Sequence, residues 1–246
     1  MVTTALFFVV AFVAAVVASL AGFGAATLTT PLLSLIIDIK QTIILIAFFH
    51  GFSSLFKVIQ LRYSVDIPTV LWYGIPAIIT AIIGAYMLDI VVPAAIVLGL
   101  GVFLILFAIT SLFNLSWRLP YNKPVLVTGG IVTGFVTGLI GLGGAIRGAF
   151  LFSMQQKKEI YIATSSTIAL FIDIARTVTY MVRGSLESRY YWFIPVLLVI
   201  SFVGTWLGVK LLRWVPENIV KRVVLIMLLF VSIFFILDYF GVVQTS

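Results

Sequence analysis

Cysteine is absent from this chain of 246 residues, and histidine occurs only once, at His50. The absence of cysteine excludes disulfide bonds, thiolate nucleophiles and thiolate-bound metal ions. Charged residues are scarce as well, at 9% of the chain, and they show no pairing of a nucleophile with a base. We therefore expect no enzyme activity, no metal site and no cofactor.

Apolar residues make up 63% of the chain and form runs too long for the core of a soluble protein of this size. This composition predicts an all-α polytopic membrane protein whose main partner is the lipid bilayer. The first twenty residues have no basic n-region, so we expect a structural segment there and not a signal peptide. The net charge of +7 comes mainly from basic residues in short loops, where it orients insertion, so we expect no nucleic-acid partner.

A glycine-containing motif occurs twice, 119 residues apart: VASLAGFGAATL begins at Val17 and VTGLIGLGGAIR at Val136. The same offset matches Lys57 with Arg176, so the similarity extends well beyond the motif. A duplication of this kind is typical of transporters. We predict two homologous membrane repeats, residues 1–113 and 125–246, joined by a loop at 114–124.

Each repeat contains one broken apolar segment followed by three stretches that can cross a bilayer. The expected segments are 4–37, 42–61, 68–88 and 91–112, then 125–154, 160–182, 191–209 and 222–240. As one straight helix, 4–37 would be about 50 Å long, which is too long for a single crossing. Each broken segment is therefore either a long helix kinked at its glycines or a re-entrant hairpin.

The basic loop residues favour re-entrant hairpins. If each broken segment returns to the face it came from, nine loop lysines and arginines lie on one face and three, Lys40, Arg183 and Arg189, on the other. If each crosses once, the split is five against seven, which orients nothing. We therefore predict four-segment repeats that are inverted relative to each other, with both termini outside.

In this arrangement, the helical arm that follows each glycine turn begins inside the membrane. Its unpaired N–H groups and positive dipole end favour an anion. The predicted substrate-binding residues are Gly22, Gly24, Ala25, Thr27, Thr29, Gly141, Gly143, Gly144, Arg147, Ser165 and Ser166. Arg147 is the most informative of these, because a guanidinium is costly in lipid unless it faces a cavity, a partner or an anion. The alternatives for Arg147 are a structural ion pair and a side chain that extends to the cytoplasmic face.

Four further ionisable residues are candidates for the transport pathway or for proton coupling. Lys57 and Arg176 occupy equivalent positions, and in inverted repeats they lie toward opposite faces. Asp173 precedes Arg176 by one helical turn, so it either neutralises Arg176 or carries a proton. His50 lies two turns before Lys57 and either titrates near neutral pH or makes a packing hydrogen bond. Snorkelling to the membrane surface is the alternative for Lys57 and Arg176.

Three motifs resemble the sulfite exporter (TauE/SafE) family: AGFGAATLTTPLL from Ala21, GLIGLGGA from Gly138 and ATSS from Ala163. The resemblance covers essentially the whole chain. It implies a bacterial inner-membrane transporter of sulfite, sulfonates such as sulfoacetate and related sulfur-containing anions, acting as an exporter that uses the proton gradient. The chain departs from the glycine-richer family motif at Ala25 and Ala26.

We therefore expect a secondary transporter that exports small sulfur-containing anions together with proton movement. The anion would be held near the membrane midplane by the two glycine-hinged helix ends and Arg147. A passive anion channel stays open as an alternative, because the same helix ends and cations would line a pore. A homodimer stays open as well.

Overall fold

The structure is a computed structural model that describes residues 2–21, 25–112, 119–153, 158–211 and 217–240. The first half contains α1 (Val2–Ala21), α2 (Ala25–Leu33), α3 (Ile39–Leu61), α4 (Ile67–Thr69), α5 (Ile75–Ile90) and α6 (Pro93–Leu112). The second half contains α7 (Lys123–Ile140), α8 (Gly143–Ser153), α9 (Lys158–Val182), α10 (Phe193–Leu211) and α11 (Glu217–Tyr239). A π-helical turn at Val70–Gly74 joins α4 to α5, and no strand occurs among the described residues.

Six of the described helical stretches are long and apolar enough to cross a membrane. They are Ile39–Ile59, Ile67–Ile90, Pro93–Thr110, Lys123–Ile140, Ile160–Val182 and Ser188–Gly208, and α1 and α11 contribute shorter apolar stretches. Helices suit a bilayer because they satisfy their own backbone hydrogen bonds. The predicted all-α polytopic membrane fold is confirmed.

Local sequence signals account for where several helices begin and end. The side chain of Asp38 accepts hydrogen bonds from the backbone N–H groups of Lys40 and Gln41 and so caps the start of α3. Asn122 caps α7 in the same way, with Oδ1 3.0 Å from the N atom of Val125. Gly141 ends α7 with φ at +83°, a left-handed conformation that favours glycine.

The helix α8 folds back along α7. Residue Gly143, at the start of α8, packs against Thr137 near the end of α7, while Phe150, further along α8, packs against Gly129. The two helices are therefore antiparallel around the left-handed turn at Gly141, and the start of α7 and the end of α8 lie toward the same face of the bundle. The helices α7 and α8 therefore form a helical hairpin, and its re-entry from one membrane face stays a prediction.

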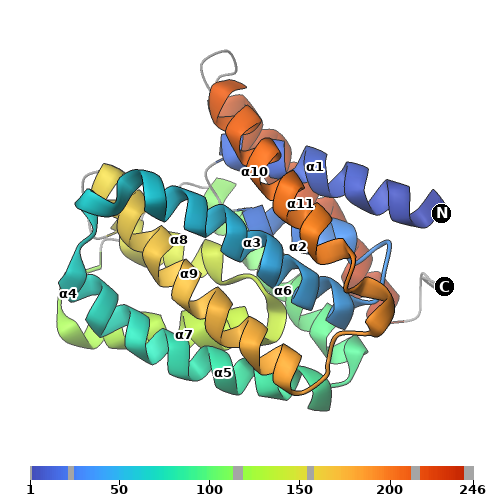
Figure 1. The fold of residues 1–246 in the computed structure, drawn as a ribbon, viewed down its shortest axis with the longest axis horizontal. Coiled ribbons are helices and arrows are strands. Elements are labelled where there is room, and N and C mark those ends of the chain that lie inside the picture. Colours follow the sequence, from blue (N-terminus) through green and yellow to red (C-terminus); the bar gives the residue numbers. More distant parts are fainter. Residues whose placement is uncertain (1, 22–24, 113–118, 154–157, 212–216, 241–246) are drawn as a thin grey trace.

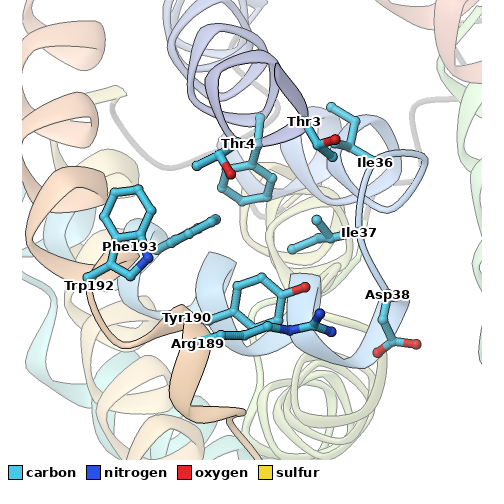
Figure 2. A pocket seen from close by; sticks show the side chains of 10 residues that line it. Thr3, Thr4, Ile36, Ile37, Asp38, Arg189, Tyr190, Trp192 and Phe193 are labelled. Carbon is cyan, nitrogen blue, oxygen red and sulfur yellow. The ribbon is translucent and has the colours of Figure 1, made fainter. Parts of the chain in front are cut away.

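The helices α1 and α2 also pack side by side. Thr3 and Thr4 at the start of α1 line one hollow together with Ile36, Ile37 and Asp38, which follow α2, and Figure 2 shows Thr3 beside Ile36. The two ends of this segment therefore share one face, which we call the N-terminal face. The predicted turn at residues 22–24 lies outside the described residues.

The two hairpins open on opposite faces of the bundle. At the N-terminal face, Gln41 near the start of α3 donates to the Ser185 carbonyl beyond the end of α9. At the other face, which we call the loop face, the N–H of Asp66 donates to Thr164 near the start of α9. Thus α3 and α9 are antiparallel, and the α7–α8 hairpin opens at the loop face. Figure 1 shows α3 and α9 lying side by side. Inverted repeats require hairpins that open in opposite directions, as these two do. The homology of the two halves stays a prediction, and so does the assignment of the inside and outside faces.

The most extensive helix contacts join one half of the chain to the other: α5 with α7, α6 with α11, α3 with α9 and α1 with α10. The α5–α7 contact is the tightest. A methyl group at Gly130, Gly134 or Gly138 of α7 would overlap a backbone carbonyl oxygen of α5 or of the π-helical turn. These glycines let two parallel helices meet backbone to backbone, as small residues do in membrane bundles.

Candidate functional site

Arg147 lies on α8, four residues after Gly143, and its side chain is buried, with 5% of its surface exposed. Its Nε donates to Ser165 Oγ on α9 at 2.9 Å. It takes part in none of the ion pairs found among the described residues. The ion pair considered for Arg147 is therefore not observed in the described part of the chain, and a role for Arg147 in anion binding stays a prediction.

Asp173 of α9 binds two basic side chains, one from each half of the chain. Its Oδ2 lies 2.6 Å from Nδ1 of His50 on α3, and its Oδ1 accepts a hydrogen bond from Arg176 Nε at 2.8 Å. All three side chains are buried. The structure thus contains the expected ion pair with Arg176 and gives His50 a hydrogen-bonded partner. A role for Asp173 in proton transfer stays a prediction.

The glycine turn between α7 and α8 is held by side chains of α9. Arg176 Nη1 donates to the Thr137 carbonyl at 3.2 Å, and the Tyr180 hydroxyl donates to the Gly138 carbonyl. The last carbonyls of a helix lack partners within the helix and carry its negative dipole end. A guanidinium and a phenol therefore stabilise the end of α7 beside Gly141, at the tip of the hairpin.

The α2 helix contains three buried threonines. Thr27, Thr29 and Thr30 are each at most 1% exposed, and α2 contacts α8. The first turn of α8 contains Gly143 and Gly144, and its backbone N–H groups have no partners within the helix. The arms of both hairpins therefore meet inside the bundle.

The remaining predicted site residues occupy varied positions. Gly22 and Gly24 lie outside the described residues, and Ala25 is the first residue of α2. Ser165 is half-buried beside Arg147, and Ser166, the next residue of α9, is 7% exposed.

Lys57 and Arg176 lie on opposite sides of the His50–Asp173 contact. Lys57 is half-buried and two turns beyond His50 on α3, while Arg176 is one turn beyond Asp173 on α9. Because α3 and α9 are antiparallel, these steps lead toward the loop face for Lys57 and toward the N-terminal face for Arg176. This is the placement expected for two cations along a pathway.

A hollow of about 520 Å³ on the N-terminal face contains none of the predicted site residues. It lies between α1, the segment after α2 and the start of α10, and Figure 2 shows Arg189 lying along the Tyr190 ring at its edge. Arg189 is 2.6 Å from Glu187 and largely exposed, so its charge is already neutralised at the surface. The buried cluster, and not this hollow, contains the groups suited to anion chemistry.

Sequence reasoning missed a set of contacts that join α3, α5 and α9 at the N-terminal face. Asp89 accepts hydrogen bonds from Arg183 at 2.7 Å and from Ser185 at 2.8 Å, and Lys40 Nζ donates to the Asp89 carbonyl. The hydrogen bond with Asp89 raises the pKa of Arg183 above its ordinary value. The sequence offered these residues only as loop charges.

Comparisons with known proteins give one match. Searches of curated proteins and of solved structures match nothing, whereas the family model described as sulfite exporter TauE/SafE matches residues 7–235. This range covers both hairpins and the buried cluster of Arg147, Asp173 and His50. The chain belongs to the sulfite exporter TauE/SafE family.

Proposed function

We propose that this integral membrane protein is a proton-coupled secondary transporter that exports small sulfur-containing anions such as sulfite or sulfoacetate. Membership of the family makes the chain a membrane transporter of sulfite-like anions. The proposal adds the coupling to protons, the direction of transport and the anion-binding site. It also places the protein in a bacterial inner membrane, as the family resemblance implies. Both termini would lie outside, because the predicted hairpins put nine basic loop residues at the loop face and three at the other face.

Arg147 is the observation that carries this proposal. No carboxylate of the described residues pairs with Arg147, and a buried cation is unfavourable in the interior of a membrane protein unless a negative charge compensates it. Ser165 supplies a polar neighbour but no charge. A small anion bound beside Arg147 would supply that charge, with the first N–H groups of α8 as further donors. The midplane site thus consists of Arg147, Ser165 and the α8 end of the glycine turn.

The His50–Asp173 contact supports proton coupling. An imidazole and a carboxylate 2.6 Å apart can share or exchange a proton within a buried pathway. Arg147 lies close enough to both groups to act on them electrostatically, so an arriving anion would change the balance of charge around the pair. Lys57 and Arg176 would extend the cationic path toward the two faces.

Uptake of labelled sulfite into proteoliposomes, with and without an imposed pH gradient, tests this function. The wild type should accumulate sulfite only with the gradient, and Arg147→Ala should lose most of the accumulation. Arg189→Ala is the control, because that arginine is exposed and paired with Glu187. Equilibration without accumulation would indicate a passive channel. Normal accumulation by Arg147→Ala would overturn the proposed site.

A further inference from the structure

Thr30 of α2 has a fully buried side chain, and its Oγ1 makes no hydrogen bond with any described atom of the chain. A threonine in a helix usually donates to the carbonyl four residues earlier, as Thr179 does to Ala175 at 2.8 Å. A buried hydroxyl without a partner is destabilising, and few occur in native structures. The position of Thr30 therefore calls for a ligand.

Thr30 and Arg176 converge on the glycine turn of the second hairpin. A Cβ atom built on Gly141 would lie 3.6 Å from Thr30 Oγ1 and 3.6 Å from Arg176 Nη1, and its next neighbour would be Ile43 at 3.8 Å. The two polar atoms are thus at most about 7 Å apart, a separation that an oxyanion with a hydrogen bond at each end can span. Because residue 141 is a glycine, no side chain stands between these two polar atoms.

Arg176 retains hydrogen-bonding capacity at this position. Its Nε binds Asp173 and its Nη1 binds the Thr137 carbonyl. Its Nη2 lies 2.8 Å from Asp173 Oδ1 but makes no hydrogen bond of acceptable geometry with a described atom. The atom that faces Gly141 is Nη1, which carries two N–H groups and donates one of them to Thr137, so the fully buried Arg176 and Thr30 both have hydrogen-bonding capacity beside one turn.

We propose that Thr30, Arg176 and the Gly141 turn form a second anion subsite, which takes one oxygen of a small oxyanion such as sulfite. This inference rests on the proposed transport function and adds a position along its pathway. The subsite differs from the Arg147 site in its donors, which are a hydroxyl of the first hairpin and a guanidinium of α9. The first hairpin thereby contributes directly to binding.

The Arg147 site and the proposed second subsite lie on opposite sides of the His50–Asp173 pair. Ser165, which binds Arg147, precedes Asp173 by eight residues, or about 12 Å along α9, whereas Arg176 follows Asp173 by one turn toward the N-terminal face. The charged or titratable groups described near this path on α3 and α9 are Lys57, His50, Asp173, Arg176, Tyr161 and Tyr180, and Arg147 faces them from α8. An exported anion would pass Arg147 first and Arg176 second.

Equilibrium binding of labelled sulfite to the purified full-length protein tests the subsite. Thr30→Val removes the hydroxyl while keeping the shape, and we expect affinity to fall about tenfold, as for one hydrogen bond to a charged ligand. Thr30→Ser keeps the hydroxyl and should bind as the wild type does. Thr179→Val is the matched control, because that hydroxyl already bonds to its own helix. The thermal midpoint of ligand-free Thr30→Val should equal or exceed that of the wild type.

The outcomes separate this inference from the proposed function. Unchanged sulfite affinity in Thr30→Val, together with lost affinity in Arg147→Ala, would overturn the second subsite and leave the proposed transport function standing. Such a result would mean that the Thr30 hydroxyl meets water only. Unchanged affinity in both variants would overturn both ideas. An equal loss of affinity in Thr30→Val and Thr179→Val would also overturn the subsite, because it would show a general effect of removing a hydroxyl.

Discussion

His50 and Asp173, 123 residues apart in the sequence, hold each other at 2.6 Å in the middle of the bundle. The contact joins α3 of the first half to α9 of the second, and Arg176 binds the other oxygen of the same carboxylate. Asp173 therefore has two distinct partners, an imidazole that can gain or lose a proton and a guanidinium that keeps its charge. Replacing each partner should have a different effect.

Replacing His50 with glutamine should abolish proton-driven accumulation without unfolding the protein. Glutamine can still donate a hydrogen bond to Asp173 but carries no exchangeable charge, and the ion pair with Arg176 remains. In proteoliposomes, His50→Gln should equilibrate sulfite but not concentrate it under a pH gradient. Ser53→Ala, on the same helix, is the control. Gradient-driven accumulation as high as that of the wild type would assign His50 a packing role only.

Replacing Asp173 with asparagine should mainly reduce stability. Arg176 is fully buried, and without the carboxylate its charge has no counterion. Removing one partner of a buried ion pair costs about 3 to 5 kcal/mol. The thermal midpoint of Asp173→Asn should fall, and adding Arg176→Gln should recover much of the loss. A midpoint of Asp173→Asn equal to that of the wild type would contradict this account.

Replacing Gly134 with alanine should weaken the packing between α5 and α7. The added methyl group would overlap the Ala77 carbonyl oxygen, so the two helices must separate, at a cost on the order of 1 to 3 kcal/mol. Gly99→Ala is the control, since its Cβ would lie 3.4 Å from a flexible end of Ile140. In detergent, the thermal midpoint of unfolding should fall for Gly134→Ala and change little for Gly99→Ala.

Alkaline pH should destabilise the wild type more than a Tyr121→Phe variant. Burial, together with the hydrogen bond to Asp66, raises the pKa of Tyr121 above its ordinary value of 10.0, while the contact with Thr69 opposes the shift. A raised folded-state pKa favours folding below the unfolded value and loses that contribution as the pH rises through the folded value. Midpoints measured from about pH 9 to about pH 11 should fall less steeply for Tyr121→Phe. If the midpoints of the two proteins fell equally steeply with pH, Tyr121 would not contribute to the loss of stability at alkaline pH.

The sequence predicted much of the fold because membrane helices leave a strong signal. The expected segments 42–61 and 160–182 coincide closely with α3 and α9. The 119-residue offset that pairs the motifs also relates these two helices, and they pack antiparallel at the centre of the bundle. The π-helical turn before α5 was not predicted, because it depends on packing and not on apolar periodicity.

The site was harder to predict than the fold. Arg147 stood out because a charge near a buried glycine turn is conspicuous, and its partner Ser165 belonged to the predicted set. The contact between His50 and Asp173 was missed, because each residue was judged against neighbours on its own helix. The special position of Thr30 could not be predicted, since a buried hydroxyl without a partner shows only in coordinates.

The pairing of helices across the two halves has a consequence for biosynthesis. The carboxylate that binds His50 is translated 123 residues after it, and α7, which covers α5, follows after α6. At ordinary elongation rates the first half waits about 10 s in the bilayer before its partners are made. During that interval His50 and the backbone face of α5 are open to lipid or to the insertion machinery, so the completed bundle assembles late.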